Sequence, residues 1–218
     1  MTGVLKDRIE AGLLLSEKLK KYSNTNSIVL AIPRGGVPVG YEIAKKLNLP
    51  LDVILSKKSP HPFNKEFAIG AVTLDSLIID EHPDVPNSYI DKEVVRLREL
   101  LRHKNKQYRG YLPAPNLKGK NLIVVDDGIA TGNTMIATIK MLRKYEPNNI
   151  IVAVPVCPTD VIEKFNTIVE EFDCLIASSY FRGVGGFFYK FDQVDDYEVS
   201  RLIQDANSKH ELTALKID

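Results

Sequence analysis

The chain has 218 residues, 44% of them hydrophobic, so it is long enough to bury the core of one domain with at most a subdomain attached. Its 29 basic and 28 acidic residues leave a net charge of +1, which argues against a nonspecific nucleic-acid binder, because such proteins carry a broad positive field. The longest apolar runs, such as 150–156, are too short to cross a bilayer, and the N-terminus lacks a signal-peptide core. We therefore expect a cytoplasmic protein with no membrane contact, in which any anion-binding site is local.

The two cysteines, Cys157 and Cys174, lie in apolar surroundings. They have neither the spacing of metal ligands nor the density of a secreted disulfide scaffold. We predict two buried thiols.

Apolar runs of strand length alternate with amphipathic helical patterns along the chain. Such alternation is typical of α/β proteins, in which right-handed crossover helices cover a parallel sheet. In the first helical pattern, 4–21, we interpret the acids and bases as a solvated face. The sequence predicts a central parallel sheet flanked by helices, with strands at 27–32, 51–55, 122–125, 150–156 and 174–177 and helices at 4–21, 39–47, 135–143, 159–169 and 192–204.

We expect a single domain, 1–218, that carries a helix-bearing insertion at 75–116 and a small C-terminal hood. The insertion holds a short edge strand at 77–79 and a long helical pattern at 89–108. One side of this helix would suit nucleic acid, but the neutral overall charge favours a solvated face. The basic residues are Arg96, Arg98, Arg102, His103, Lys104, Lys106 and Arg109.

The most informative stretch is 122–134, in which a buried strand ends in two carboxylates and is followed by a glycine loop and a helix. In an open parallel sheet such a loop lies at the carboxyl edge, where ligands bind. Helix N-termini combine unpaired N–H donors with a favourable dipole. A phosphate therefore fits the N–H groups of Ala130 to Thr134, assisted by the Thr131 and Thr134 hydroxyls.

The two carboxylates, Asp126 and Asp127, accept hydrogen bonds and repel phosphate. An acid pair directly before an anion-binding loop therefore suits a ligand with hydroxyls near its phosphate, such as a ribose 5-phosphate. The alternative is that Asp127 or Thr131 only caps the helix. Capping needs one such residue, and the stretch has two acids, two threonines and two glycines in order.

A second strand-to-glycine loop occurs at 33–38, Pro-Arg-Gly-Gly-Val-Pro. Gly35 and Gly36 allow the backbone to approach a ligand closely, and Arg34 offers a fixed positive charge to an anion. The alternative is a tight strand-to-helix turn with an exposed arginine.

Lys57 and Lys58 follow the strand at 51–55, and we expect them at the same edge of the sheet. The polar, proline-rich segment 59–66 predicts an exposed loop, and His61 is interpreted as a loop residue. Two solvated lysines are the alternative to a pyrophosphate contact.

The stretch Val-Val-Asp-Asp-Gly-Ile-Ala-Thr-Gly-Asn-Thr resembles the phosphoribosyl pyrophosphate (PRPP) signature of type I phosphoribosyltransferases. The resemblance implies that Asp126 and Asp127 hold the ribose hydroxyls and bind Mg²⁺, directly or through water. It implies a 5′-phosphate site at Gly128, Ala130, Thr131, Gly132, Asn133 and Thr134, together with the two acids. It also implies a pyrophosphate site at Arg34, Gly35, Gly36 and Lys58, and a catalytic set of Asp126, Asp127, Arg34, Lys57 and Lys58.

The resemblance extends along the chain to a subfamily of phosphoribosyltransferases of unassigned substrate, through 31–38, 66–72, 125–132 and 152–156. Family members carry a mobile loop where Lys58 leads into 59–66. That loop usually has more glycine, so Pro60 and Phe63 predict a stiffer lid in this chain. A second departure from the family is a lysine at 57 in place of the usual arginine. Family members usually form homodimers, so the resemblance also implies a homodimer for this chain.

The acceptor pocket is predicted in the hood, 178–204. Its clustered aromatics form a flat wall for a planar base or, equally, core packing, and the tail from Asp205 is expected to be loose. Ala130 occupies the position where hypoxanthine-guanine enzymes carry an acid, so a 6-oxopurine acceptor is disfavoured. The wall residues are Tyr180, Phe181, Val184 and Phe187.

The resemblance implies transfer of ribose 5-phosphate from PRPP to a small nitrogenous acceptor, a nucleobase, with release of pyrophosphate. The alternative is a non-catalytic PRPP or nucleotide sensor. A P-loop NTPase is excluded because the sequence contains no GxxxxGK[ST].

Overall fold

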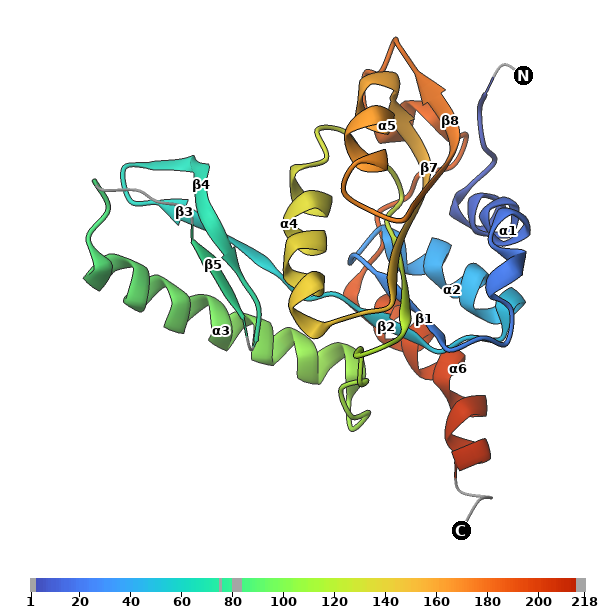
Figure 1. Ribbon diagram of the computed structural model, residues 1–218, viewed down its shortest axis with the longest axis horizontal. Coiled ribbons are helices and arrows are strands. Elements are labelled where there is room, and N and C mark those ends of the chain that lie inside the picture. Colours follow the sequence, from blue (N-terminus) through green and yellow to red (C-terminus); the bar gives the residue numbers. More distant parts are fainter. Residues whose placement is uncertain (1–2, 75, 80–83, 215–218) are drawn as a thin grey trace. The chain divides into compact units, whose positions relative to one another are not determined.

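The computed structural model describes residues 3–74, 76–79 and 84–214 (Figure 1). The chain divides into two compact units, one formed by Met1–Ile54 with Leu112–Asp218 and the other by Leu55–Tyr111. The second unit therefore starts well before residue 75, where the sequence places the insertion. Within the described residues, no helix is both long and apolar enough to cross a membrane.

The first unit is built on a five-stranded sheet in which every neighbouring pair is parallel. This confirms the predicted α/β fold with a central parallel sheet. The strand order is β2 (Leu51–Val53), β1 (Ser27–Ala31), β6 (Asn121–Val125), β7 (Asn149–Pro158) and β8 (Glu171–Ser178).

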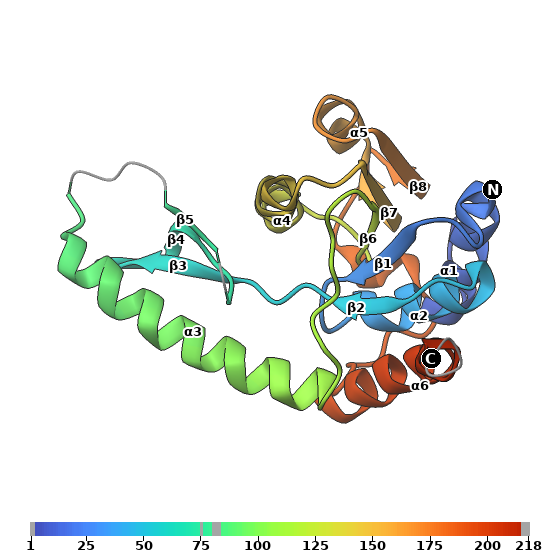
Figure 2. The same cartoon turned by 60° about the horizontal axis from the view of Figure 1, so that its bottom comes forward.

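Helices cover both faces of this sheet, as Figure 2 shows, with α4 and α5 on one side and α1 and α2 on the other. The central strands are accordingly buried on both faces, and residues 122–125 of β6 have no solvent exposure. Short 3-10 turns occur at η1 (Lys20–Tyr22), η2 (Arg143–Tyr145) and η3 (Val184–Phe187). The helices of the unit are α1 (Arg8–Lys18), α2 (Gly36–Leu47), α4 (Asn133–Leu142), α5 (Thr159–Asn166) and α6 (Asp196–Ala214).

The strand order reverses direction at β1, because β2 lies on one side of β1 and β6 on the other. In open α/β sheets such a reversal opens a crevice at the carboxyl ends of the two strands, and ligands bind there. The loops that follow β1 and β6 are the two glycine loops singled out from the sequence. The topology therefore places them side by side.

The C-terminal helix is longer than predicted. We expected a loose tail from Asp205, but α6 continues to Ala214. Tyr41 donates a hydrogen bond to the Asp205 carboxylate, and Asn207 Nδ2 donates to the Leu51 carbonyl at 2.7 Å. The first bond joins α6 to α2, and the second docks α6 on β2, an edge strand with unpaired backbone groups.

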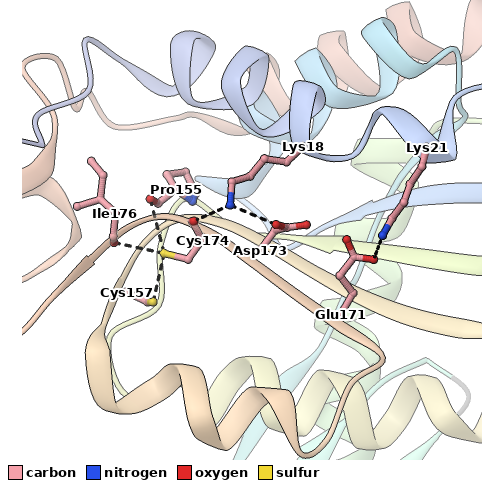
Figure 3. A network of polar contacts seen from close by, with 8 residues as sticks. All are labelled: Lys18, Lys21, Pro155, Cys157, Glu171, Asp173, Cys174 and Ile176. Carbon is pink, nitrogen blue, oxygen red and sulfur yellow. Dashed lines mark hydrogen bonds and ion pairs between the residues drawn. The ribbon is translucent and has the colours of Figure 1, made fainter. Parts of the chain in front are cut away.

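The other edge strand, β8, is held by Lys18, the last residue of α1, and by Lys21 of η1 (Figure 3). Lys18 Nζ contacts Asp173 Oδ1 at 3.3 Å and donates to the Cys174 carbonyl at 3.2 Å, and Lys21 pairs with Glu171 at 2.7 Å. The Cys157 and Cys174 sulfurs lie 3.2 Å apart, and both are free thiols. Cys157 is buried as predicted, whereas Cys174 is only half-buried because it lies on an edge strand.

The second unit has an antiparallel sheet and one long helix. The sheet consists of β3 (Lys57–His61), β4 (Asn64–Val72) and β5 (Leu77–Ile79), and the helix is α3 (Asn87–Arg109). Val94, Leu97 and Leu101 of α3 form a buried cluster with Val72 of β4.

The prediction of an exposed loop over 59–66 was wrong, because this segment forms the end of β3, the turn and the start of β4 in the β3–β4 hairpin. Ser59 pairs with Gly70 and is fully buried, and the register shifts on either side of Pro60. A proline cannot donate to a ladder and is tolerated at such an irregularity. Pairing with β4 thus overrides the loop-like composition.

Two adjacent leucines of α3 test this packing. Leu101 is 1% exposed and Leu100 is 46% exposed. We expect Leu101→Ala to lower the free energy of unfolding by about 2–5 kcal/mol, because it removes a buried side chain and leaves a cavity. Leu100→Ala should change it by less than about 1 kcal/mol. Urea denaturation followed by circular dichroism measures both, and equal losses would contradict the described packing.

Candidate functional site

The two glycine loops are in contact at the switch between β1 and β6. Ile32, the residue after β1, donates its N–H to the Val125 carbonyl at 2.8 Å. A Cβ on Gly35 would lie 1.9 Å from Asp127 Oδ2, and one on Gly36 would lie 2.7 Å from the Val125 carbonyl oxygen. A side chain at position 36 would collide with the backbone of the other loop, and one at position 35 would displace the Asp127 carboxylate. The glycines are therefore required for the close approach of the two loops.

The loop after β6 ends at the N-terminus of α4 in an open cluster of N–H groups. Gly132 adopts a φ of +77°, and no side chain caps the helix, so neither Asp127 nor Thr131 has the capping role considered from the sequence. Within the part of the chain that the structure describes, no protein acceptor receives the N–H groups of Ala130 to Thr134. Unpaired donors at a helix N-terminus are the usual protein site for a phosphate.

The two acids differ in environment. Asp126 is partly buried, and its Oδ1 accepts the N–H of Asp127 at 2.9 Å. Burial, and then the charge of Asp127, raise the pKa of Asp126 well above its usual value. A carboxylate kept partly out of water beside a second carboxylate is costly, and such costs are typical of functional sites.

Asp127 is held by a residue that the sequence analysis assigned to a solvated face. Arg8, the first residue of α1, donates from Nε and Nη2 to Asp127 Oδ2 at 3.0 and 2.7 Å. The two side chains are only 11% and 16% exposed. A lone arginine in the first turn of an amphipathic helix, 119 residues from its partner, gives no sequence signal of this contact.

In the loop after β1, the predicted anion-binding side chain, Arg34, is accessible to solvent. Arg34 is 42% exposed, and its Nη1 lies 3.9 Å from the Asp196 carboxylate at the start of α6. The peptide bond between Pro33 and Arg34 is cis. Gly36 donates its N–H to the Ile32 carbonyl at 3.1 Å. The Gly35 N–H has no acceptor within the described residues, so it is the one of the two predicted glycine donors that is available to a ligand.

The predicted acceptor wall is partly core packing. The Phe181 and Phe187 rings stack with centroids 5.3 Å apart, and both pack with Val184 against the buried cluster that contains Val156. Val184 also packs beside Gly128, because a Cβ built on Gly128 would lie 2.7 Å from the Val184 methyl carbons. Tyr180 is 88% exposed. A role of these residues in binding an acceptor stays a prediction.

Lys57 and Lys58 are exposed residues at the start of β3, in the second unit. His61 lies in the same strand and its Nε2 contacts the Asp84 carboxylate at 2.9 Å. A role of Lys57 and Lys58 in binding an anion stays a prediction.

Comparisons with known proteins agree with this geometry. A family model described as the phosphoribosyl transferase domain matches residues 5–170. The chain belongs to the phosphoribosyltransferase family. This confirms the resemblance to type I phosphoribosyltransferases drawn from the signature at 122–134.

Proteins from Mycobacterium tuberculosis and Thermus thermophilus are similar to this chain along most of its length. In two strains of Mycobacterium tuberculosis, the protein named "Putative phosphoribosyl transferase" is 35% identical over 207 residues, which is 92% of this chain and 46% of the relative. The chain thus spans less than half the length of these curated relatives. The crystal structure of TT1426 from Thermus thermophilus is 34% identical and superposes with a TM-score of 0.81 over 93% of this chain and 98% of that one.

Asp126→Asn tests the cost of the acid pair. The pKa of Asp126 is raised on folding, so its carboxylate costs stability above the folded-state pKa, and the cost vanishes below the unfolded pKa of about 3.9. At neutral pH the variant should therefore be more stable, by about 1 kcal/mol or 2–4 °C in Tm. The gain should disappear as the pH falls towards 4.

The matched control for this variant is Asp160→Asn, which changes an exposed acid on α5. It should leave the Tm within the change expected of a surface substitution at every pH. An Asp126→Asn protein that is less stable than the wild type at pH 7 would contradict the inferred cost.

Proposed function

We propose that the chain transfers ribose 5-phosphate from PRPP to a nitrogen acceptor with release of pyrophosphate. The observation that carries the proposal is the juxtaposition of an acid pair with an uncapped helix N-terminus, in contact with the Gly35 loop. The acids suit the ribose hydroxyls, and the N–H groups suit the 5′-phosphate. Membership of the phosphoribosyltransferase family supports the same ligand.

In this proposal the catalytic contribution of the protein is mostly positioning and electrostatics. Ala130 to Thr134 anchor the 5′-phosphate, and the acids fix the ribose and offset positive charge that develops at its anomeric carbon. The Arg34 guanidinium and the Gly35 N–H stabilise the departing pyrophosphate. A contact of Lys57 and Lys58 with the pyrophosphate stays a prediction from the sequence.

The residues present fit a magnesium ion carried by the substrate. Mg²⁺ is usually held in proteins by one or two carboxylates plus substrate phosphates and water, not by a cage of protein ligands. Within the described residues there is no cluster of three or more acids, histidines or cysteines that could hold a metal ion, and Asp126 and Asp127 form a pair. These two would hold the ion, which when bound neutralises charge on the leaving pyrophosphate.

We propose a nucleobase other than a 6-oxopurine as the acceptor. By the resemblance to the family, enzymes that use 6-oxopurines carry an acid at this position to accept the purine N–H. This chain has the exposed Ala130 there. Tyr180, Phe181, Val184 and Phe187 are the proposed wall of the acceptor pocket.

The test is incubation of the protein with PRPP and Mg²⁺ against a panel of nucleobases, with new nucleotides scored by mass spectrometry. We expect one base to be converted and Asp127→Asn to lower the yield at least about 100-fold, because a group that positions the reacting sugar is lost. Asp160→Asn changes an exposed acid of α5 that is not part of the proposed site, and it should keep the wild-type yield.

A different result separates the enzyme from a sensor. If PRPP binds in a calorimeter, Asp127→Asn abolishes that binding and no base in the panel is consumed, the chain is a non-catalytic PRPP-binding protein. Failure of PRPP to bind at all would reject both functions.

A further inference from the structure

Arg8 is fixed by more contacts than an ordinary surface ion pair. Besides the two bonds to Asp127 Oδ2, its Nη1 donates to the Asp192 carbonyl at 2.8 Å. Its guanidinium carbon lies 3.8 Å from the centroid of the Phe191 ring. All three nitrogens are thus used and one face is stacked, so the orientation of the group is determined from several directions.

The backbone around Arg8 is held against the hood. Leu5 donates its N–H to the Phe187 carbonyl at 2.8 Å, and Tyr189 donates back to the Leu5 carbonyl at 2.9 Å. Lys190 donates to the Lys6 carbonyl at 2.9 Å. The start of α1 and residues 187–192 therefore form one wall, and Arg8 connects that wall to the acid pair.

The charge balance of the acid pair depends on this arginine. Asp126 and Asp127 are adjacent, and within the described residues the cation that pairs with this acid pair is Arg8, through Asp127. The cation is mostly excluded from water, so it is weakly screened. By comparison, Lys18 at the other end of α1 is 45% exposed and pairs with Asp173 of β8.

We propose that Arg8 is a positioning residue that acts as the internal counter-ion of Asp127. It fixes the Asp127 carboxylate for the ribose, and it competes with a divalent cation for that carboxylate. The ribose half of this inference rests on the proposed function, whereas the competition with a cation does not.

The two halves predict effects of opposite sign. Loss of the Arg8 charge leaves two neighbouring carboxylates without a cation, which favours binding of a divalent metal ion. The same loss frees Asp127 to rotate, which weakens binding of a ligand that needs the carboxylate in one orientation. A merely structural role would weaken both kinds of binding, because damage to the fold does not create affinity.

The experiment measures Mn²⁺ binding by electron paramagnetic resonance without PRPP, and PRPP binding by calorimetry, for the full chain. Arg8→Gln should tighten Mn²⁺ binding about tenfold, because it leaves a partly buried charge pair unbalanced, and weaken PRPP binding by a similar factor. The matched control is Lys18→Gln, which breaks the other cation contact of α1 to an acid and should alter neither affinity.

A double variant identifies the atom through which Arg8 acts. If Arg8 works through Asp127, then Arg8→Gln should give no tighter Mn²⁺ binding in an Asp127→Asn background than Asp127→Asn alone. A gain that persists there would show a general charge effect and overturn the inference.

Arg8→Lys provides a second measurement if Arg8→Gln fails to fold. Lysine keeps the charge but cannot hold Asp127, the Asp192 carbonyl and the Phe191 ring together, so Mn²⁺ binding should stay at the wild-type level while PRPP binding weakens several-fold. Mn²⁺ binding of Arg8→Gln equal to or weaker than that of the wild type, including no binding by either, overturns the competition. If the wild-type protein binds Mn²⁺ but not PRPP, the proposed function is rejected. The competition is then still decided by comparing Mn²⁺ binding of Arg8→Gln with that of the wild type.

Discussion

The site depends on the close contact between the Gly35 loop and the carboxylate of Asp127. The two loops follow strands that are far apart in the chain. They meet because β1 and β6 are neighbours at the reversal of the sheet, where Ala31 pairs with Val125. A single methyl group at position 35 would lie inside the carboxylate. The backbone of one loop and the acids of the other are thereby brought together at the carboxyl edge of the sheet.

The rest of the first unit serves to hold that contact rigid. Fully buried strands fix the starting points of both loops, and both edge strands have partners, β2 in α6 and β8 in Lys18 of α1 and Lys21 of η1. The hood is bonded to the residues before α1, and Arg8 passes from that wall to Asp127. The proposed reaction requires preorganisation of this kind, because a site that stabilises charge without rearranging lowers the barrier to bond breaking.

The sequence predicted the sheet and the ligand loop because both are local patterns. Apolar runs followed by glycine loops define β1 and β6, and the order of residues 126–134 carries the ligand chemistry within one short stretch. The β3–β4 hairpin was missed because its strand residues, such as Ser59 and Pro60, have loop-like composition, and pairing with β4 decides their structure. Arg8 was missed for a related reason: its partner is distant in the chain, and burial by the hood, which no local pattern encodes, changes a solvated charge into a counter-ion.

The central claim is that one loop recognises both a sugar phosphate and the hydroxyls of its ribose. Calorimetric titration of ribose 5-phosphate against 2-deoxyribose 5-phosphate, at fixed Mg²⁺, tests it most directly because the two ligands differ in one hydroxyl. The account predicts that the ribose compound binds about tenfold more tightly, as expected when a hydrogen bond to a charged acceptor is lost. Equal affinity of the two compounds would show that the acids do not contact the 2-hydroxyl, and would contradict the assignment of that hydroxyl to Asp126 and Asp127.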